Sequence, residues 1–134
     1  MDRARERFEQ GRVAHLATVD TKGRPAIVPC CFVLDGDTVY SAVDDKPKST
    51  TRLARLTNTE ANSHASLLVD HYDEDWSALW WVRARGSARE VTDGGERARA
   101  VERLRAKYPQ YETHRLDGPV LAVDVEGWRA WSVE

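Results

Sequence analysis

Residues 44–51 form the stretch of the sequence best suited to binding a ligand, and they read Asp-Asp-Lys-Pro-Lys-Ser-Thr-Thr. A proline separates two lysines and stiffens the chain, and three hydroxyl residues follow that can begin a helix. The side chains concerned are Lys46, Lys48, Ser49, Thr50 and Thr51. Ammonium groups, hydroxyl donors and the free backbone N–H groups of a helix start would then converge, which suits a phosphate or a carboxylate. A solvated loop with a simple helix N-cap fits the same residues, so both interpretations stay open.

Tryptophan is frequent in this chain, with five in 134 residues. Trp76, Trp80 and Trp81 cluster on one segment. Large aromatic faces suit a flat ring ligand, but they are also favoured in cores and at interfaces. We favour a ligand contact for Trp76, and packing in the core or at a dimer interface for Trp128 and Trp131.

Motifs for hydrolysis or for nucleotide binding are missing from the sequence. His71 lies among Asp70, Asp73 and Asp75, but no metal-ligand spacing such as HxxxH or CxxC occurs, so a solvated acidic turn fits better. There is no nucleophile elbow, P-loop or dinucleotide-binding glycine motif. If the protein is an enzyme, we therefore expect a bound cofactor to supply the chemistry.

The two cysteines, Cys30 and Cys31, are adjacent. In a strand their side chains point to opposite faces, so they are poorly placed to form a disulfide with each other. We expect two small side chains that are buried or half-buried.

Composition limits the classes of function. The formal net charge is −2 and the isoelectric point about 6.1, which argues against nucleic acid as the main partner, because such proteins present a basic surface. No apolar run approaches the roughly 20 residues of a membrane span, and the N-terminus lacks the apolar core of a signal peptide. We therefore expect a cytoplasmic protein without membrane contact. Its length fits a single domain over residues 1–134.

The first half of the sequence predicts a helix and three strands. The ranges are 3–10 for the helix and 13–19, 26–34 and 38–43 for the strands. Gly23 lies in a turn that favours a positive φ, and Asp35-Gly36-Asp37 is typical of a tight hairpin. We expect these three strands to form an antiparallel meander.

The second half predicts two more helices and about four strands. The elements are a short helix containing Leu53 and Leu56, strands over 65–70 and 76–92, a helix from 94 to 108, and a hairpin of 119–125 with 128–133 around Glu126-Gly127. Gly86 is expected to bend the long strand. The longer helix shows one apolar face, made of Ala98, Val101, Leu104 and Tyr108. About seven mostly antiparallel strands with three helices indicate a mainly β, α+β fold, a small barrel flanked by helices.

Several short motifs occur in an order that resembles a known superfamily. They are Gly-Arg-Pro at 23–25, Lys-Pro-Lys at 46–48, Ser-Leu-Leu-Val-Asp at 66–70, Asp75-Trp76 and Gly-Ser-Ala at 86–88. Together they resemble the split β-barrel flavin-binding superfamily, which contains the pyridoxamine-phosphate-oxidase-like proteins. The sequence is more closely similar to the actinobacterial branch that uses the deazaflavin coenzyme F420.

This resemblance implies an antiparallel split barrel that forms a homodimer, with two cofactor sites at the subunit interface. The residues implied to contact the phosphate and tail of the cofactor are Lys46, Lys48, Ser49, Thr50 and Thr51. Those implied to lie along its ring, or to reach it from the neighbouring subunit, are Pro29, Cys30, Cys31, Trp76 and Ser77.

One departure from the superfamily narrows the choice of cofactor. Members that oxidise pyridoxamine phosphate with flavin mononucleotide (FMN) carry a basic residue on the second strand, whereas residues 26–32 here hold no charge. We therefore predict an F420-dependent oxidoreductase that transfers hydride between the deazaflavin ring and a small electron-poor substrate. The alternatives are a non-catalytic protein that binds or stores F420 or flavin, and an FMN-dependent enzyme of the pyridoxamine-phosphate-oxidase type.

Overall fold

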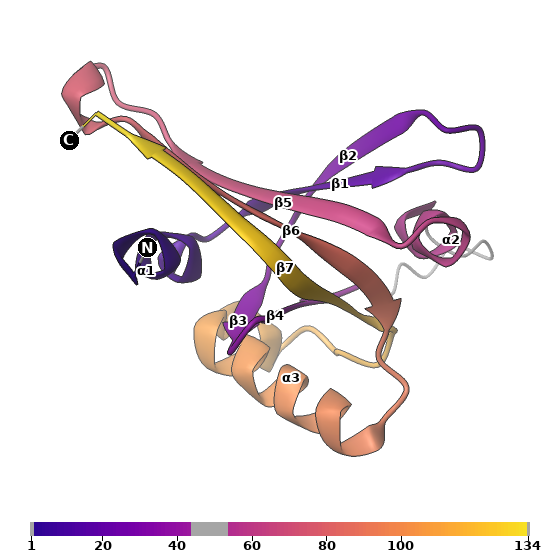
Figure 1. Ribbon diagram of the computed structural model, residues 1–134. Coiled ribbons are helices and arrows are strands. Elements are labelled where there is room, and N and C mark those ends of the chain that lie inside the picture. The colour runs from indigo at the N-terminus through magenta and orange to yellow at the C-terminus, as the bar shows by residue number, and fades with distance from the viewer. Residues whose placement is uncertain (1, 44–53, 134) are drawn as a thin grey trace.

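The computed structural model describes residues 2–43 and 54–133. Within these residues, one seven-stranded antiparallel sheet is flanked by three α-helices (Figure 1). The strands are β1 (Ala14–Val19), β2 (Pro25–Cys30), β3 (Val33–Asp35), β4 (Thr38–Ala42), β5 (His64–His71), β6 (Trp80–Glu90) and β7 (Val120–Ser132). The helices are α1 (Asp2–Gln10), α2 (Ala54–Ala61) and α3 (Gly94–Lys107), with two 3₁₀ turns, η1 (Trp76–Ala78) and η2 (Pro109–Glu112). None of the described helices is both long and apolar enough to cross a membrane.

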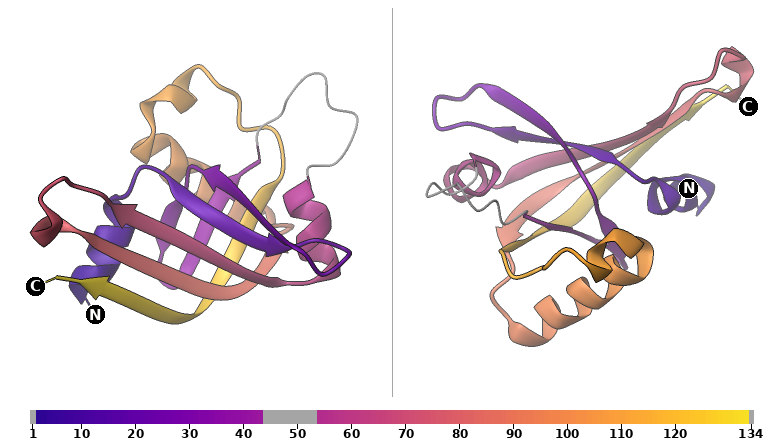
Figure 2. Two further views of the ribbon diagram at one scale, coloured as in Figure 1. Left: turned by 90° about the horizontal axis from the view of Figure 1, so that it is seen from above. Right: turned by 180° about the vertical axis from the view of Figure 1, so that it is seen from behind.

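The order of the strands explains how the sheet becomes a barrel. It is β2-β1-β5-β6-β7-β4-β3, so β2 and β3, which are consecutive along the chain, form opposite edges of the sheet. The sheet twists strongly, and the chain passes from one edge to the other at residues 31–32 (Figure 2). The predicted mainly β, split-barrel architecture is therefore confirmed.

The prediction of one strand over 26–34, in a three-stranded meander, is wrong. β2 pairs with β1, whereas β3 pairs with β4 on the other side of the barrel. The pairing of β2 with β1 ends at Cys30. Two residues later the ring of the fully buried Phe32 packs against Phe8, with the ring centres 5.0 Å apart. The apolar pattern is the same for one strand or two, so only this tertiary packing separates them.

The long strand β6 begins later than predicted, because Trp76–Ala78 form η1. The predicted bend at Gly86 is confirmed as a shift of register against β7 between Arg85 and Gly86. Glycine is required there, since a Cβ atom would lie 1.9 Å from the carbonyl oxygen of Asp124.

The predicted final hairpin is wrong, because its residues form the single strand β7, which pairs with β6 from Leu121 to Ser132. Gly86 faces Val125 and Arg85 faces Gly127, so Glu126 is the extra residue of a β-bulge. A Glu-Gly pair fits a turn or a bulge, and the long partner strand decides in favour of the bulge.

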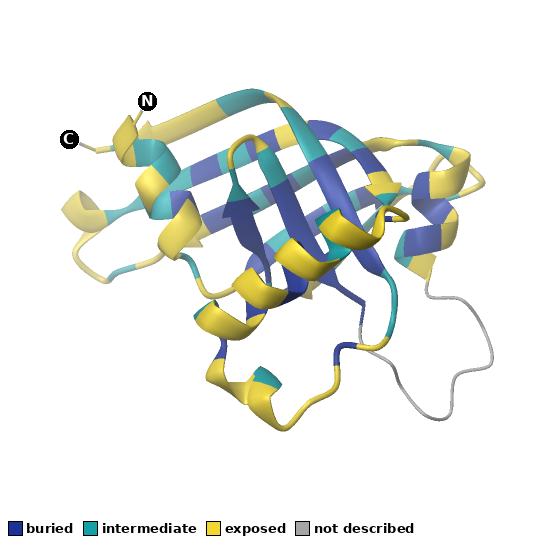
Figure 3. Ribbon diagram, turned by 90° about the horizontal axis from the view of Figure 1, so that it is seen from below, coloured by how far each residue is buried: buried dark blue, intermediate teal, exposed yellow. Residues whose placement is uncertain are grey.

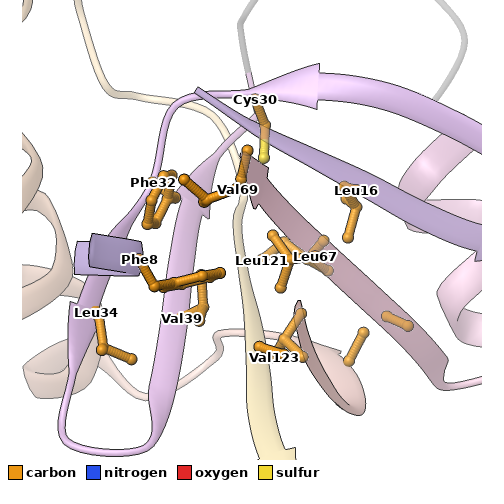
Figure 4. Packing of buried hydrophobic residues seen from close by; sticks show 14 of the residues in the cluster. Phe8, Leu16, Cys30, Phe32, Leu34, Val39, Leu67, Val69, Leu121 and Val123 are labelled. Carbon is orange, nitrogen blue, oxygen red and sulfur yellow. The ribbon is translucent and has the colours of Figure 1, made fainter. Parts of the chain in front are cut away.

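Two clusters of buried side chains hold these elements together. The larger one lies inside the barrel and includes Phe8 from α1 with Leu67 and Leu121 from the sheet (Figure 4). The smaller one lies between α3 and strands β3, β4 and β7, whose buried faces α3 covers (Figure 3). Ala98, predicted on the buried face of α3, is exposed, and Ala100 is fully buried instead.

Candidate functional site

A hollow of about 240 Å³ lies where the chain passes from β2 to β3, and we call it the crossing hollow. Its lining residues are Val13, Pro29, Cys30, Cys31, Ala42, Arg55 and Tyr111. Ala42 ends β4 and Arg55 lies in α2, so described residues on both sides of segment 44–53 border the hollow. Complete small-molecule sites usually measure about 300–1,000 Å³, so the crossing hollow accounts for part of such a site.

The three residues predicted to lie along a cofactor ring are brought together in this hollow. Pro29 is exposed on the outward face of β2, Cys31 is half-buried, and the buried side chain of Cys30 points into the core (Figure 4). The Ser41 hydroxyl donates a 2.8 Å hydrogen bond to the Cys31 carbonyl oxygen and so fixes the crossing to β4. The hollow thus presents a rigid, uncharged surface at Pro29 and Cys31.

The two cysteines are free thiols, buried and half-buried as predicted. Burial raises the pKa of the Cys30 thiol, although the Ser41 hydroxyl and the charge of Arg55 act in the opposite direction. Cys30 therefore stays a neutral thiol near pH 7 and is not an activated nucleophile.

Arg55 is a lining residue that reasoning from the sequence missed. It lies in the first turn of α2, and that turn contains no acidic residue. The helix dipole disfavours a cation at this position, but no motif in the sequence marks Arg55 as a lining residue. Only the fold shows that this helix borders the hollow.

The predicted contacts to the phosphate and tail lie outside the described residues. They are Lys46, Lys48, Ser49, Thr50 and Thr51. Their roles stay predictions, and the positions of Ala42 and Arg55 indicate only where the segment that carries them begins and ends.

Trp76 and Ser77 do not meet the crossing hollow within one chain. They lie in η1 at the tip of the β5–β6 hairpin, at the far end of the sheet from α2 (Figure 1). The Asp75 carboxylate holds this turn by accepting bonds from the Ser77 hydroxyl (2.7 Å) and backbone N–H (3.1 Å). The side chain of Trp76 is 67% exposed. A cofactor contact from this turn would have to come from a neighbouring subunit.

The predictions for Trp128 and Trp131 have different outcomes. Trp128 packs edge-on against Phe8 with the ring centroids 5.1 Å apart, which confirms core packing. Trp131 is 45% exposed beside Trp81 and does not pack in the core, so its place at a dimer interface stays a prediction.

In the acidic turn near His71, the carboxylates accept hydrogen bonds from backbone N–H groups of the same turn. Asp73 accepts a 2.7 Å hydrogen bond from the Asp75 N–H, and Asp75 caps η1. Over the described residues, no group of three or more His, Cys, Asp or Glu side chains is arranged to hold a metal ion.

A second hollow, of about 400 Å³, adjoins the first, and we call it the tyrosine hollow. Its lining residues are Arg12, Cys31, Tyr108, Gln110, Tyr111 and His114. Cys31 and Tyr111 line both hollows. The rings of Tyr108 and Tyr111 meet edge to face at 5.8 Å. The two hollows therefore lie side by side along the strand crossing, and we refer to them together as the recess.

The buried hydroxyl of Tyr108 fixes the floor of this recess. It accepts a hydrogen bond from the Phe32 N–H (3.0 Å), and its own proton is shared between the carbonyl oxygens of Arg12 (2.9 Å) and Phe32 (3.1 Å). Burial raises the pKa of Tyr108 to about 12, so the hydroxyl keeps its proton. A backbone N–H that no neighbouring strand can pair is thereby satisfied.

Lys107 supports the same crossing from α3. Its ammonium group donates to the carbonyl oxygens of Glu9 (2.9 Å) and Phe32 (3.0 Å), and it lies 3.8 Å from the centre of the Phe32 ring. Burial, followed by the charge of Arg12, lowers the pKa of Lys107 to about 8. Lys107 lines neither hollow, so the guanidinium that lines the tyrosine hollow is that of Arg12.

A split barrel with a partial ligand site at its strand crossing defines a class of small cofactor-binding folds, and the sequence places the chain within it. Residues 1–126 match the family described as Pyridoxamine 5'-phosphate oxidase. The chain belongs to this pyridoxamine 5'-phosphate-oxidase family. No curated protein matches the sequence.

Solved structures show the same fold at low sequence identity. A conserved hypothetical protein from Mycobacterium tuberculosis has a TM-score of 0.77 and 16% identity, over 96% of this chain and 82% of that one. An FAD-binding protein from Mesorhizobium loti has a TM-score of 0.72 and 18% identity, over 96% and 91%. HutZ, the heme storage protein from Vibrio cholerae, has a TM-score of 0.74 and 17% identity, over 98% and 92%. One fold thus carries different cofactors.

Proposed function

We propose that this protein is an oxidoreductase that uses the deazaflavin coenzyme F420 and transfers hydride between its ring and a small electron-poor substrate. The observation that carries the proposal is the crossing hollow, which joins the uncharged surface of Pro29 and Cys31 to the cation Arg55 beside segment 44–53. Such a donor set fits a flat ring joined to an anionic tail. When bound, the coenzyme supplies the hydride, and the chain's own residues bind, orient and exclude water.

The uncharged second strand favours F420 over FMN. β2 runs from Pro25 to Cys30 as Pro-Ala-Ile-Val-Pro-Cys, without a charged side chain. The phosphate of FMN would lack a counter-ion from this strand, and removing a charge-assisted contact typically costs about 1.5–3 kcal/mol. An FMN-dependent enzyme of the pyridoxamine-phosphate-oxidase type is the weaker alternative for this reason.

We further propose a homodimer whose interface completes the cofactor site. The outer face of the barrel carries an apolar recess lined by His15, Ala17, Ile27, Ser66, Leu68, Asp70, Trp81 and Arg83. Ile27 lies two residues before Pro29 on the same outward face of β2, so β2 contributes to both this recess and the crossing hollow. A second copy seated there would cover Ile27, which is 67% exposed. We propose that the η1 turn of this second copy supplies the contacts expected of Trp76 and Ser77.

Turnover of reduced F420 tests the proposed activity. The purified protein is mixed with reduced F420 and a panel of quinones and enones, and the reoxidation of the coenzyme is followed by its absorbance. We expect oxidation above the background without protein. Arg55→Ala should raise the KM for the coenzyme, whereas the matched control Arg105→Ala, on an exposed part of α3, should leave it unchanged.

A binding or storage protein without turnover is the alternative from a different class, and the similarity to a heme storage protein gives it weight. Tight binding of F420 with no oxidation of its reduced form by any member of the panel would favour this alternative. FMN released from the purified protein and identified by mass would instead favour the FMN-dependent enzyme.

A further inference from the structure

We infer that the tyrosine hollow is the substrate side of the site, and that it takes a small planar conjugated molecule bearing a carboxylate or a similar anionic group. This inference rests on the proposed function, because the ligand is a substrate only if the crossing hollow holds the coenzyme ring. The binding chemistry of the tyrosine hollow stands on its own residues.

The tyrosine hollow lies next to the proposed site of the coenzyme ring. Cys31 and Tyr111 line both hollows, so a molecule in the tyrosine hollow lies beside whatever occupies the crossing hollow. Its volume of about 400 Å³ lies within the usual range for small-molecule sites, roughly 300–1,000 Å³. The tyrosine hollow is thus large enough for a compact ligand without any part of the crossing hollow.

Charge is the second argument. Arg12 and His114 line the tyrosine hollow together with the amide of Gln110, and the described lining contains no carboxylate. The Arg12 guanidinium lies 4.6 Å from the centre of the Tyr108 ring, and one of its nitrogens donates to the Lys107 carbonyl oxygen at 3.0 Å. These two contacts orient the group, and a guanidinium has five N–H donors, so others can bind a carboxylate.

Shape is the third argument. The half-buried ring of Tyr111, held edge to face by the buried Tyr108, offers aromatic surface to a flat ligand. The Nδ1 atom of His114 lies 3.0 Å from the Gln110 carbonyl oxygen, which requires a proton on Nδ1 and fixes the plane of the imidazole ring. An aromatic wall with an oriented guanidinium beside it is complementary to a conjugated anion.

The test uses 4-nitrobenzoate and its neutral counterpart 4-nitrobenzamide as probes of the coenzyme-free protein. Backbone amide shifts in ¹H–¹⁵N spectra locate each probe and give its affinity. We expect the largest shifts at Cys31, Tyr111 and His114, and binding of the anion roughly tenfold tighter than binding of the amide. Equal affinity for the two probes, or shifts confined to other parts of the chain, would overturn the inference.

Variants show whether Arg12 carries the preference. Arg12→Met should remove most of the tenfold difference between the probes, while Arg105→Met on α3 should keep it. A preserved difference in Arg12→Met would count against the assignment. If Arg12→Met does not fold, the location and the preference measured in the unaltered protein still decide.

A ternary experiment separates this inference from the proposed function. With F420 bound, 4-nitrobenzoate should still bind, because the two hollows adjoin without coinciding. Mutual exclusion of probe and coenzyme would show that the tyrosine hollow holds part of the coenzyme, and the inference would fail. Failure of F420 to bind at all would instead remove the proposed function, and the probe data would still show whether an anion pocket exists.

Discussion

At the scale of single residues, Tyr108 holds the backbone of the segment that connects β2 to β3. Its hydroxyl pairs the Phe32 N–H, which lies between two strands and has no strand partner. Lys107 holds the carbonyl oxygen of the same residue, Phe32. The floor of the recess therefore depends on side-chain hydrogen bonds from α3 and the residue that ends it.

Tyr108→Phe tests this role. The substitution leaves the buried Phe32 N–H without its acceptor, so we expect a loss of about 1–3 kcal/mol in the free energy of unfolding, measured with urea. Tyr72→Phe is the control, because Tyr72 is 63% exposed, and its change should stay within about 0.5 kcal/mol. Equal effects of the two substitutions would contradict the role given to Tyr108.

The residues of the crossing hollow differ in whether the sequence alone could predict them. Pro29, Cys30 and Cys31 come from the resemblance, and the structure gathers them at one hollow with Arg55. Arg55 and Tyr111 are separated from them by more than twenty residues of sequence, and only the fold shows that they share the site. The residues between 44 and 51 raised the first expectation of an anion site, and that expectation still rests on their types and spacing.

At the scale of elements, local patterns predicted most segments but not their partners. The tight turn at Gly36 and the positive φ of Gly23 were predictable, because each depends on a few adjacent residues. The division of 26–34 into β2 and β3, and the fusion of the final hairpin into β7, were not. In both cases an identical local pattern fits two structures, and packing against Phe8 or pairing with β6 selects one.

The bulge between β6 and β7 gives an element-scale prediction. Gly86→Ala would place a methyl group 1.9 Å from the Asp124 carbonyl oxygen, so the strands must shift. We expect a loss of about 1–3 kcal/mol in unfolding free energy, the usual scale for overpacking. Gly127→Ala, across the same bulge but with open space at its Cβ position, should change stability by less than about 1 kcal/mol. Tolerance of both substitutions would contradict the register described.

An ion-pair network ties α3 to the sheet. Glu96 accepts bonds from Arg89 (2.7 and 2.9 Å) and from the Tyr40 hydroxyl (2.6 Å), and Arg89 also binds Asp124. The bonds from Arg89, followed by the bond from Tyr40, lower the pKa of Glu96 to about 2. Because this pKa lies below its ordinary value of 4.5, the stabilisation is complete above pH 4.5 and is lost as the pH falls towards 2.

Glu96→Gln isolates this contribution. At pH 7 the variant should be less stable by about 1 kcal/mol, a modest figure because Arg89 is 42% exposed and screened by solvent. The difference from the unaltered protein should shrink towards zero as the pH falls from 4.5 to 2. A difference in unfolding free energy that does not change with pH would show that the charge of Glu96 plays no part.

At the scale of the whole molecule, the proposed dimer connects the features that one chain leaves apart. The crossing hollow is smaller than a complete site, η1 lies at the far end of the sheet, and the outer face is apolar. In the proposed dimer, a second copy covers the apolar outer face, and its η1 turn completes the site that begins at the crossing hollow.

Ile27→Glu tests the dimer. A buried carboxylate without a partner is costly, so the variant should be a monomer in sedimentation experiments and should bind F420 less tightly. Ala98→Glu, on an exposed position of α3, should keep the oligomeric state of the unaltered protein. Dimers that persist in Ile27→Glu would place the interface on another face.

Titration of the purified protein with F420 and, separately, with FMN tests the central claim most directly. We predict saturable binding of F420 that is tighter than binding of FMN, and a loss of about 1–3 kcal/mol in F420 binding free energy for Arg55→Ala and for Lys48→Ala. Arg105→Ala should bind F420 as the unaltered protein does. Tight binding of FMN alone, or no binding of either cofactor, would contradict the account.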